Sequence, residues 1–382
     1  MSYDVVIVGG GSAGCVLANR LTECGVLNVL LLEAGPDYTS QTMPRDIRDS
    51  AFSPSSHDWG YASQPDALGI SVAIPRGKVI GGSSSVNYCF AMRARPQDHN
   101  NWQSLGNEGW SYADVLPFYR RMERYAYGED CWHGRSGPYK LDCFNWDQLE
   151  PTAAAAALAS DALGYARVRD VNAPGEPGFA RAPLSAVDGI RQSTAVTYLE
   201  DARERKNLTV RGGVEVDCVL FDSDRAIGVR LVSGEIIDAT NVILSAGTYN
   251  SPAILMRSGV GPEAHLSELG IDVVKVNPGV GQNLTEHPVM WNIYAAKPPG
   301  RDVSAMFQTV LSVKSDDDLV DYDLHVLPTA AVPTELMPRT FIPPSMEHPT
   351  GWDFVFFCFV YAAEVARIGA SCVAESEGGP VD

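Results

Sequence analysis

The sequence is poor in positive charge and lacks the patterns of secreted proteins. It has 29 Lys and Arg against 47 Asp and Glu residues, for a formal net charge of −18. A chain this acidic repels phosphate backbones, so we expect no nucleic acid among its partners. The residues after Met1 run directly into an apolar segment, without a basic stretch or a small-residue cleavage site. This pattern predicts a cytoplasmic location.

Long hydrophobic runs and paired cysteines are also missing. The most apolar late stretch, residues 354–363, is far shorter than the ~20 residues that a membrane-spanning helix needs. We therefore predict a buried strand there and no membrane span. The eight cysteines are scattered without a C-x-x-C motif or Cys/His ligand spacing. This argues against both a disulfide framework and a metal site, and we expect buried free thiols.

The 382 residues, 45% of them hydrophobic, are enough for a globular protein of two domains. Residues 3–9 (YDVVIVG) and 28–33 (NVLLLE) read as buried parallel strands on either side of a helix over 12–24. Residues 241–246 (NVILSA) repeat the buried-strand pattern. Further helices are predicted within 98–125, 151–163 and 194–205, and further strands at 208–211, 215–222, 226–231 and 236–239.

A glycine-rich turn lies between the first predicted strand and helix. Residues 9–14 (GGGSAG) satisfy G-x-G-x-x-G, and Glu33 ends the second strand nineteen residues after Gly14. Gly9 permits the tight turn, Gly11 lets the backbone approach a pyrophosphate, and Gly14 allows close helix–strand packing. Glu33 can accept a hydrogen bond from a ribose hydroxyl, which favours NAD or FAD over NADP. The turn predicts a dinucleotide and leaves NAD and FAD open, with a turn that binds nothing as the alternative.

A second glycine-rich stretch, residues 77–87 (GKVIGGSSSVN), follows a connection rich in Pro, Ser, Asp and Gly. Its double glycine, Gly81 and Gly82, precedes Ser83 and two further serines. Such a loop offers unencumbered backbone N–H groups and hydroxyls to an anion. We predict that it contacts the pyrophosphate from a second side.

This stretch and two later ones resemble a known enzyme family. Residues 77–87 and 245–261 (SAGTYNSPAILMRSGVG) are similar to the two signature motifs of the glucose–methanol–choline oxidoreductases, flavoenzymes that oxidise alcohols with FAD. Residues 278–288 (PGVGQNLTEHP) resemble the family's next recurring segment. The likeness covers residues 3–292 in the expected order, and it favours FAD over NAD.

The resemblance implies which residues contact the FAD. Val79 and the segment from Asn87 to Ala91 would lie against the isoalloxazine, and Val216 would meet the adenine through its backbone. The pair at 246–247 would flank the adenylate. Together with the glycine turn, the expected cofactor-binding residues are Gly9, Gly11, Ser12, Ala13, Gly14, Glu33, Ala34, Val79, Gly81, Gly82, Ser83, Asn87, Val216, Ala246 and Gly247.

Some relatives attach the flavin covalently through a histidine of the first signature motif. Val86 stands at that place, so the resemblance implies non-covalent FAD. The family's chemistry also needs a base for the alcohol proton, a task that suits histidine. In relatives this histidine comes from a C-terminal segment, to which we find no match before Asp382. His287 and His325 are candidates, although a structural role is the favoured interpretation of each.

We expect FAD-dependent oxidation of a primary alcohol to an aldehyde, with dioxygen or another acceptor reoxidising the flavin. Two alternatives stay open. One is a flavin-binding protein without turnover, which the unmatched histidine segment favours. Because that segment is unmatched, we expect this chain to oxidise alcohols very poorly even with flavin bound. The other uses the same scaffold as a lyase or as a quinone- or NAD-linked dehydrogenase.

The expected fold is α/β, with a doubly wound, Rossmann-like FAD-binding domain and an inserted α+β substrate lobe. After Pro278 apolar and polar residues alternate among many prolines, which is typical of an antiparallel sheet. We assign residues 1–150 and 188–288 to the FAD-binding domain. Residues 151–187 and 289–382 are assigned to the substrate lobe.

Overall fold

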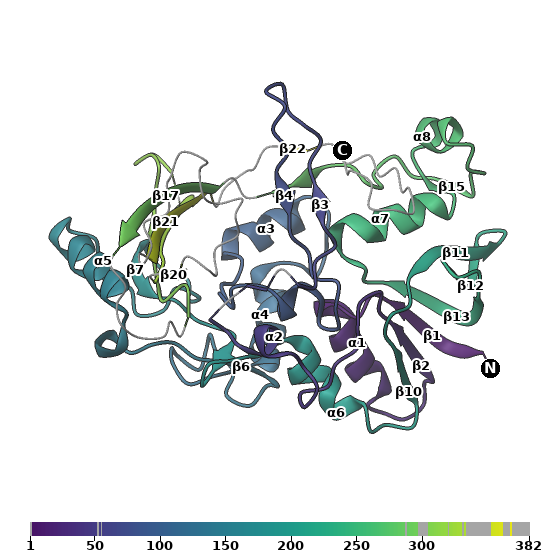
Figure 1. Ribbon diagram of the computed structural model, residues 1–382, viewed down its shortest axis with the longest axis horizontal. Helices are drawn as coiled ribbons and strands as arrows, with labels where there is room; N and C mark the ends of the chain where they lie inside the picture. Colours follow the sequence, from purple (N-terminus) through teal and green to yellow (C-terminus); the bar gives the residue numbers. More distant parts are fainter. Residues whose placement is uncertain are drawn as a thin grey trace.

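The computed structural model describes residues 2–51, 53–54, 56–286, 289–296, 305–319, 321–330, 332–333, 353–361 and 367–368. Two six-stranded sheets lie at opposite ends of the molecule, with helices around them (Figure 1). The predicted α/β fold with a Rossmann-like sheet and a second, antiparallel sheet is confirmed. The helices are α1 (Ser12–Thr22), α2 (Arg45–Arg48), α3 (Pro96–Ser104), α4 (Tyr112–Met122), α5 (Pro151–Ala162), α6 (Glu200–Ala202), α7 (Gly247–Arg257) and α8 (Glu263–Glu268).

The first sheet has the strand order β10-β2-β1-β13-β12-β11. Its first four strands are parallel, and β12 and β11 continue it antiparallel. These strands are β1 (Tyr3–Val8), β2 (Val29–Leu32), β10 (Leu208–Arg211), β11 (Val216–Asp222), β12 (Arg225–Leu231) and β13 (Ile236–Leu244).

Both faces of the central strand β1 are buried. Val5 and Ile7 pack in one cluster with α1 and α6, and Val6 and Val8 pack in another with Ile254 of α7. Successive side chains of a strand point to opposite faces, so a continuous apolar run matches a sheet covered on both sides. The carboxyl end of β1 is therefore held firmly where the glycine turn begins.

Two predicted elements differ from the structure. Residues 236–239 and 241–246 were expected as separate strands, but they form the single strand β13. Its residues 236–238 pair antiparallel with β12, and its residues 239–244 pair parallel with β1. The helix predicted over 194–205 is a π-helical turn, Ala195–Leu199, followed by the short α6.

The second sheet is antiparallel throughout, in the order β17-β21-β19-β18-β7, with β20 beside β21. Residues 353–361 form a strand, as the apolar stretch predicted. The helix α5 lies beside this sheet (Figure 1). The division into two lobes at the residues assigned above stays our proposal. The strands are β7 (Gly178–Arg181), β17 (Val289–Ala296), β18 (Thr309–Val313), β19 (Leu324–Pro328), β20 (Val332–Pro333) and β21 (Asp353–Tyr361).

Short elements complete the described chain. The hairpin of β3 and β4 projects from the molecule at the top of Figure 1. A 3-10 helix, Gly82–Ser85, falls in the second glycine-rich stretch, and another spans Trp146–Gln148. The short strands are β3 (Tyr61–Ala62), β4 (Ala73–Ile74), β5 (Glu123–Tyr125), β6 (Tyr139–Leu141), β8 (Ala186–Val187), β9 (Ile190–Arg191), β14 (Val260–Gly261), β15 (Lys275–Val276), β16 (Leu284–Thr285) and β22 (Arg367–Ile368).

The cysteines correct one expectation. Cys24 and Cys131 are exposed rather than buried, because one follows the end of α1 and the other lies in a surface loop. The side chains of Cys358 and Cys372 lie outside the described part. Within the described ranges, no helix combines the length and apolarity needed to cross a bilayer. The cysteines that are both free and buried, as expected, are Cys15, Cys89, Cys143 and Cys218.

A buried ionic cluster joins the segments between the two sheets. The Nδ1 atom of His133 lies 2.8 Å from Oε1 of Glu123, and its Nε2 lies 2.6 Å from Oδ2 of Asp170. The Nη2 atom of Arg93 lies 2.7 Å from the same Glu123 oxygen. Burial disfavours a charged imidazole, but the hydrogen bonds to the two carboxylates outweigh it and raise the pKa of His133.

Replacing His133 with Gln should lower the free energy of unfolding by about 2 kcal/mol near neutral pH, because one buried carboxylate loses a charged partner. A raised folded-state pKa means that the stabilisation by His133 is complete below its unfolded pKa of about 6.5 and is lost as pH rises through the folded value. Urea unfolding of both proteins at about pH 6 and about pH 9 measures this. A difference between them that does not shrink at the higher pH would contradict the charged cluster.

Candidate functional site

The glycine turn brings backbone groups to the carboxyl edge of β1. Gly9 has a φ of 98°, and a Cβ built on it would lie 2.5 Å from the carbonyl oxygen of Ser245. A Cβ at Gly14 would lie 1.9 Å from the carbonyl oxygen of Gly9. At Gly11 a Cβ would meet nothing nearer than Cα of Gly82, at 3.8 Å. Packing of the protein itself thus requires Gly9 and Gly14, whereas Gly11 borders open space.

The double glycine packs directly against this turn. Gly81 and Gly82 have φ values of 84° and 52°, in the left-handed region that favours glycine. The Gly81 N–H donates to the carbonyl oxygen of Gly10 at 2.7 Å, and a Cβ on Gly82 would lie 2.7 Å from Cα of Gly11. The predicted second contact to an anion therefore lies beside the first. The opening residues of α1 carry N–H groups that have no acceptor within the helix, as an anion site requires.

Glu33 is buried at the end of β2 and is 6% exposed. Its Oε2 accepts the N–H of Gly10 at 2.8 Å, and its Oε1 accepts the N–H of Gly35 at 2.8 Å. Burial raises the pKa of Glu33 to about 7, against the lowering effect of these two N–H groups and of Lys78. The carboxylate thus stabilises the glycine turn through its hydrogen bond to Gly10, in addition to the predicted role at a ribose.

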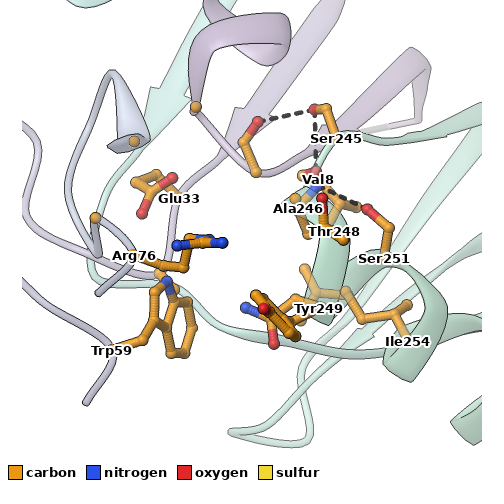
Figure 2. A pocket seen from close by; sticks show the side chains of 18 of the residues that line it. Val8, Glu33, Trp59, Arg76, Ser245, Ala246, Thr248, Tyr249, Ser251 and Ile254 are labelled. Carbon is orange, nitrogen blue, oxygen red and sulfur yellow. Dashed lines mark hydrogen bonds between the residues drawn. The ribbon is translucent and has the colours of Figure 1, made fainter. Parts of the chain in front are cut away.

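These segments enclose a pocket of about 540 Å³, which is within the usual range for a ligand site. Figure 2 shows Glu33, Ser245 and Ala246 around it, with Val8 and Ile254 on its apolar walls. Four expected residues do not line it: Gly14 and Gly81 pack behind the turn, Val79 is buried in the core, and Asn87 lies beyond the 3-10 helix. The expected residues that do line it are Gly9, Gly11, Ser12, Ala13, Glu33, Ala34, Gly82, Ser83, Val216, Ala246 and Gly247.

An aromatic and cationic wall of this pocket was not predicted from the sequence. Trp59, Arg76 and Tyr249 face the pocket in Figure 2, and Tyr61 and Asn250 also line it. The guanidinium of Arg76 lies 5.2 Å from the Tyr249 ring centre, and the Tyr61 hydroxyl donates to Oδ1 of Asn250 at 2.8 Å. Residues 59–76 fall in the stretch without hydrophobic periodicity, so no sequence pattern pointed to them.

Of the two candidate histidines, the structure describes only His325, and it does not bring that residue to this pocket. His325 lies on β19 in the second sheet, where it is 8% exposed and its Nδ1 is 3.1 Å from Oγ of Ser312. It is absent from the residues that line the pocket. His287 lies outside the described residues.

Comparison with known proteins agrees with this site. The sequence profile of the family described as GMC oxidoreductase matches residues 3–289. This range includes the glycine turn, the double glycine and the strand end at Ser245. The chain belongs to the GMC oxidoreductase family.

Named relatives of this family are similar over most of the chain. An oxygen-dependent choline dehydrogenase of Photobacterium profundum is 40% identical over 307 residues, which are 78% of this chain and 54% of the relative. A GMC-type oxidoreductase of Rhodococcus erythropolis is 35% identical over 358 residues, covering 91% of this chain and 69% of the relative. The chain thus spans about half the length of the choline dehydrogenases that it matches.

A solved structure supports the fold directly. Pyridoxine 4-oxidase from Mesorbium loti superimposes with a TM-score of 0.86 at 29% identity, over 97% of this chain and 73% of the oxidase. The prediction of a glucose–methanol–choline flavin oxidoreductase is confirmed at the level of the family, and so is FAD as its cofactor. The pocket suits FAD because Gly11 lines it and a Cβ there would meet no protein atom closer than 3.8 Å, so the backbone of the turn is open to a pyrophosphate.

Glu33 should make FAD binding depend on pH. A ribose hydroxyl donates a stronger hydrogen bond to the charged carboxylate than to the neutral carboxylic acid, so affinity should fall as pH drops below about 7, by about tenfold between pH 8 and pH 5. Glu33→Gln should weaken binding about tenfold at pH 8 and abolish this dependence. Fluorescence titration of FAD measures both, with Glu235→Gln, an exposed carboxylate paired with Arg211, as the control. Equal pH profiles for all three proteins would remove Glu33 from the ribose site.

Proposed function

We propose that this chain binds FAD non-covalently in the pocket at the glycine turn and oxidises a small primary alcohol to an aldehyde. The proposal draws most support from one observation. Three stretches far apart in the sequence, around residues 11, 82 and 246, line a single pocket. These stretches are the glycine turn and the two signature motifs of the family. When bound, FAD supplies the acceptor for a hydride.

In this proposal, each side of the pocket contacts a different part of FAD. The opening N–H groups of α1 and the N–H of Ser83 bind the pyrophosphate, which the positive end of the helix dipole favours, while the Gly82 N–H donates to the carbonyl oxygen of Val79. Glu33 accepts from the ribose, and the backbone of Val216 contacts the adenine. The apolar walls keep water away from the bound dinucleotide, which strengthens these polar contacts.

The relatives' names favour a primary alcohol. Choline and pyridoxine both carry a primary hydroxymethyl carbon, and one relative is named as oxygen-dependent and another as an oxidase. We therefore infer a small primary alcohol as substrate and dioxygen, or another acceptor, as the oxidant of the reduced flavin.

Non-covalent binding predicts that acid precipitation releases the flavin. Val86 stands where some relatives have a linking histidine, and its side chain is buried in the core beside Val79. It carries no nucleophilic atom. Absorbance and fluorescence should therefore find nearly all FAD in the supernatant, and the precipitated protein should show no flavin fluorescence on a denaturing gel. Flavin that stays with the protein would contradict non-covalent binding.

The oxidation itself is tested by anaerobic mixing. The purified chain, loaded with FAD, is incubated with choline, pyridoxine, benzyl alcohol or ethanol, and with tert-butanol as a control that has no hydrogen on its carbinol carbon. The proposal expects at least one primary alcohol to bleach the flavin, and air to restore the colour. Bleaching by dithionite but by none of these alcohols would contradict it.

A further inference from the structure

A fully buried arginine joins three segments next to the cofactor pocket. Arg191 on β9 is 1% exposed. Its Nε donates to the carbonyl oxygen of Ile47 at 2.9 Å, and its Nη2 donates to that of Asp49 at 3.2 Å. Its Nη1 donates to the carbonyl oxygen of Asn87 and lies 3.1 Å from Sγ of Cys89. Burying a charged guanidinium costs desolvation free energy. The N–H groups of this one donate to backbone carbonyl oxygens of three residues rather than to water or to a surface carboxylate.

The turn that Arg191 holds is strained. Cys89 has a φ of 60°, which is uncommon for a residue with a side chain, and it is 1% exposed. Its N–H donates to Oδ1 of Asn87 at 3.0 Å, and its carbonyl oxygen accepts from the N–H and the hydroxyl of Ser185 at 2.7 and 3.2 Å. Strained residues of this kind persist where the surroundings determine them from several sides, and they cluster at functional sites.

This turn continues directly from the pocket. The N–H groups of Val86 and Asn87 donate to the carbonyl oxygen of Ser83, at 3.3 and 3.0 Å, and Ser83 lines the pocket. One turn of backbone therefore connects the pyrophosphate side of the pocket to Cys89. A displacement of Cys89 would move the backbone that precedes it.

We propose that Arg191 is a positioning residue that fixes the position of the Asn87–Cys89 turn relative to the flavin ring. This inference rests on the proposed function, together with the expectation from the family resemblance that the segment from Asn87 lies against the isoalloxazine. The fork of the guanidinium reaches Ile47, Asp49 and Asn87 at once, which a lysine ammonium on a flexible stem does not reproduce.

The test is Arg191→Lys, which keeps the charge and loses the fork. It should weaken FAD binding about tenfold, shift the absorption bands of the bound flavin, and change its midpoint potential. Phe179→Leu is the control, because Phe179 is equally buried but lies on β7 in the second sheet. It should lower the melting temperature and leave the flavin bands and potential unchanged.

Cys89→Ala is the second variant, in case Arg191→Lys does not fold. It keeps Arg191 and removes one of its contacts, so it should shift the flavin bands in a smaller amount with little loss of stability. If the folded Arg191→Lys protein, or Cys89→Ala in its place, binds flavin with unaltered bands and potential, Arg191 is merely structural and the inference is overturned. If the unsubstituted chain does not bind FAD at all, the proposed function fails first, which is a distinct result.

Discussion

Replacing Gly11 with Val should abolish FAD binding while the protein stays folded. Gly11 has φ −75° and ψ −161°, an extended conformation that valine adopts readily. A Cβ there meets no protein atom closer than 3.8 Å, so the fold accommodates the branching atom of the new side chain. The two methyl groups would instead occupy the open space beside the turn, where a pyrophosphate must approach the backbone. We expect FAD affinity to fall at least about a hundredfold, which corresponds to about 2.7 kcal/mol.

Titration of FAD by fluorescence measures this loss, and circular dichroism with thermal unfolding measures the fold. Gly175→Val is the matched control, because a Cβ at Gly175 meets nothing within 4 Å and this loop lies outside the cofactor pocket. It should bind FAD as the unsubstituted chain does. A Gly11→Val protein that retains flavin would show that the pyrophosphate does not lie at this turn.

Replacing Gly14 with Ala should have the opposite pattern and strongly destabilise the fold. Alanine is favoured over glycine inside a helix by about 1 kcal/mol, so helix propensity alone predicts a more stable protein. The Cβ, however, would lie 1.9 Å from the carbonyl oxygen of Gly9 and 3.0 Å from Oγ of Ser245. Since the nearer atom is backbone, α1 must move away from β1. We expect a loss of about 4 kcal/mol or more in the free energy of unfolding.

Chemical denaturation of the FAD-free protein measures this change without interference from cofactor binding. Gly175→Ala, in open surroundings, should stay within about 0.5 kcal/mol of the unsubstituted chain. A Gly14→Ala protein of normal stability would show that the turn and helix are farther apart than described. Gly11→Val and Gly14→Ala together distinguish two roles of glycine in the same motif: Gly11 is needed for binding and Gly14 for packing.

The parallel sheet and the glycine turn are predictable because their signals are local. Residues 3–9 and 28–33 are apolar on both faces of a strand. The glycine pattern indicates a dinucleotide-binding turn because it lies between a predicted strand and a predicted helix. The resemblance of residues 77–87 and 245–261 then selected FAD. These two stretches line one pocket because of the fold, which members of the family share.

The sequence by itself determined the α/β class, the dinucleotide turn, the buried acid Glu33 and, through the family's motifs, the cofactor. Only the tertiary structure decided that Glu33 also braces the turn, that Arg76 and Tyr249 form a pocket wall, and that Arg191 holds a strained turn. The reason is that periodicity and turn chemistry act between residues close along the chain. Contacts such as that of Arg191 with Ile47 join residues far apart in sequence, and their formation depends on how every intervening element packs.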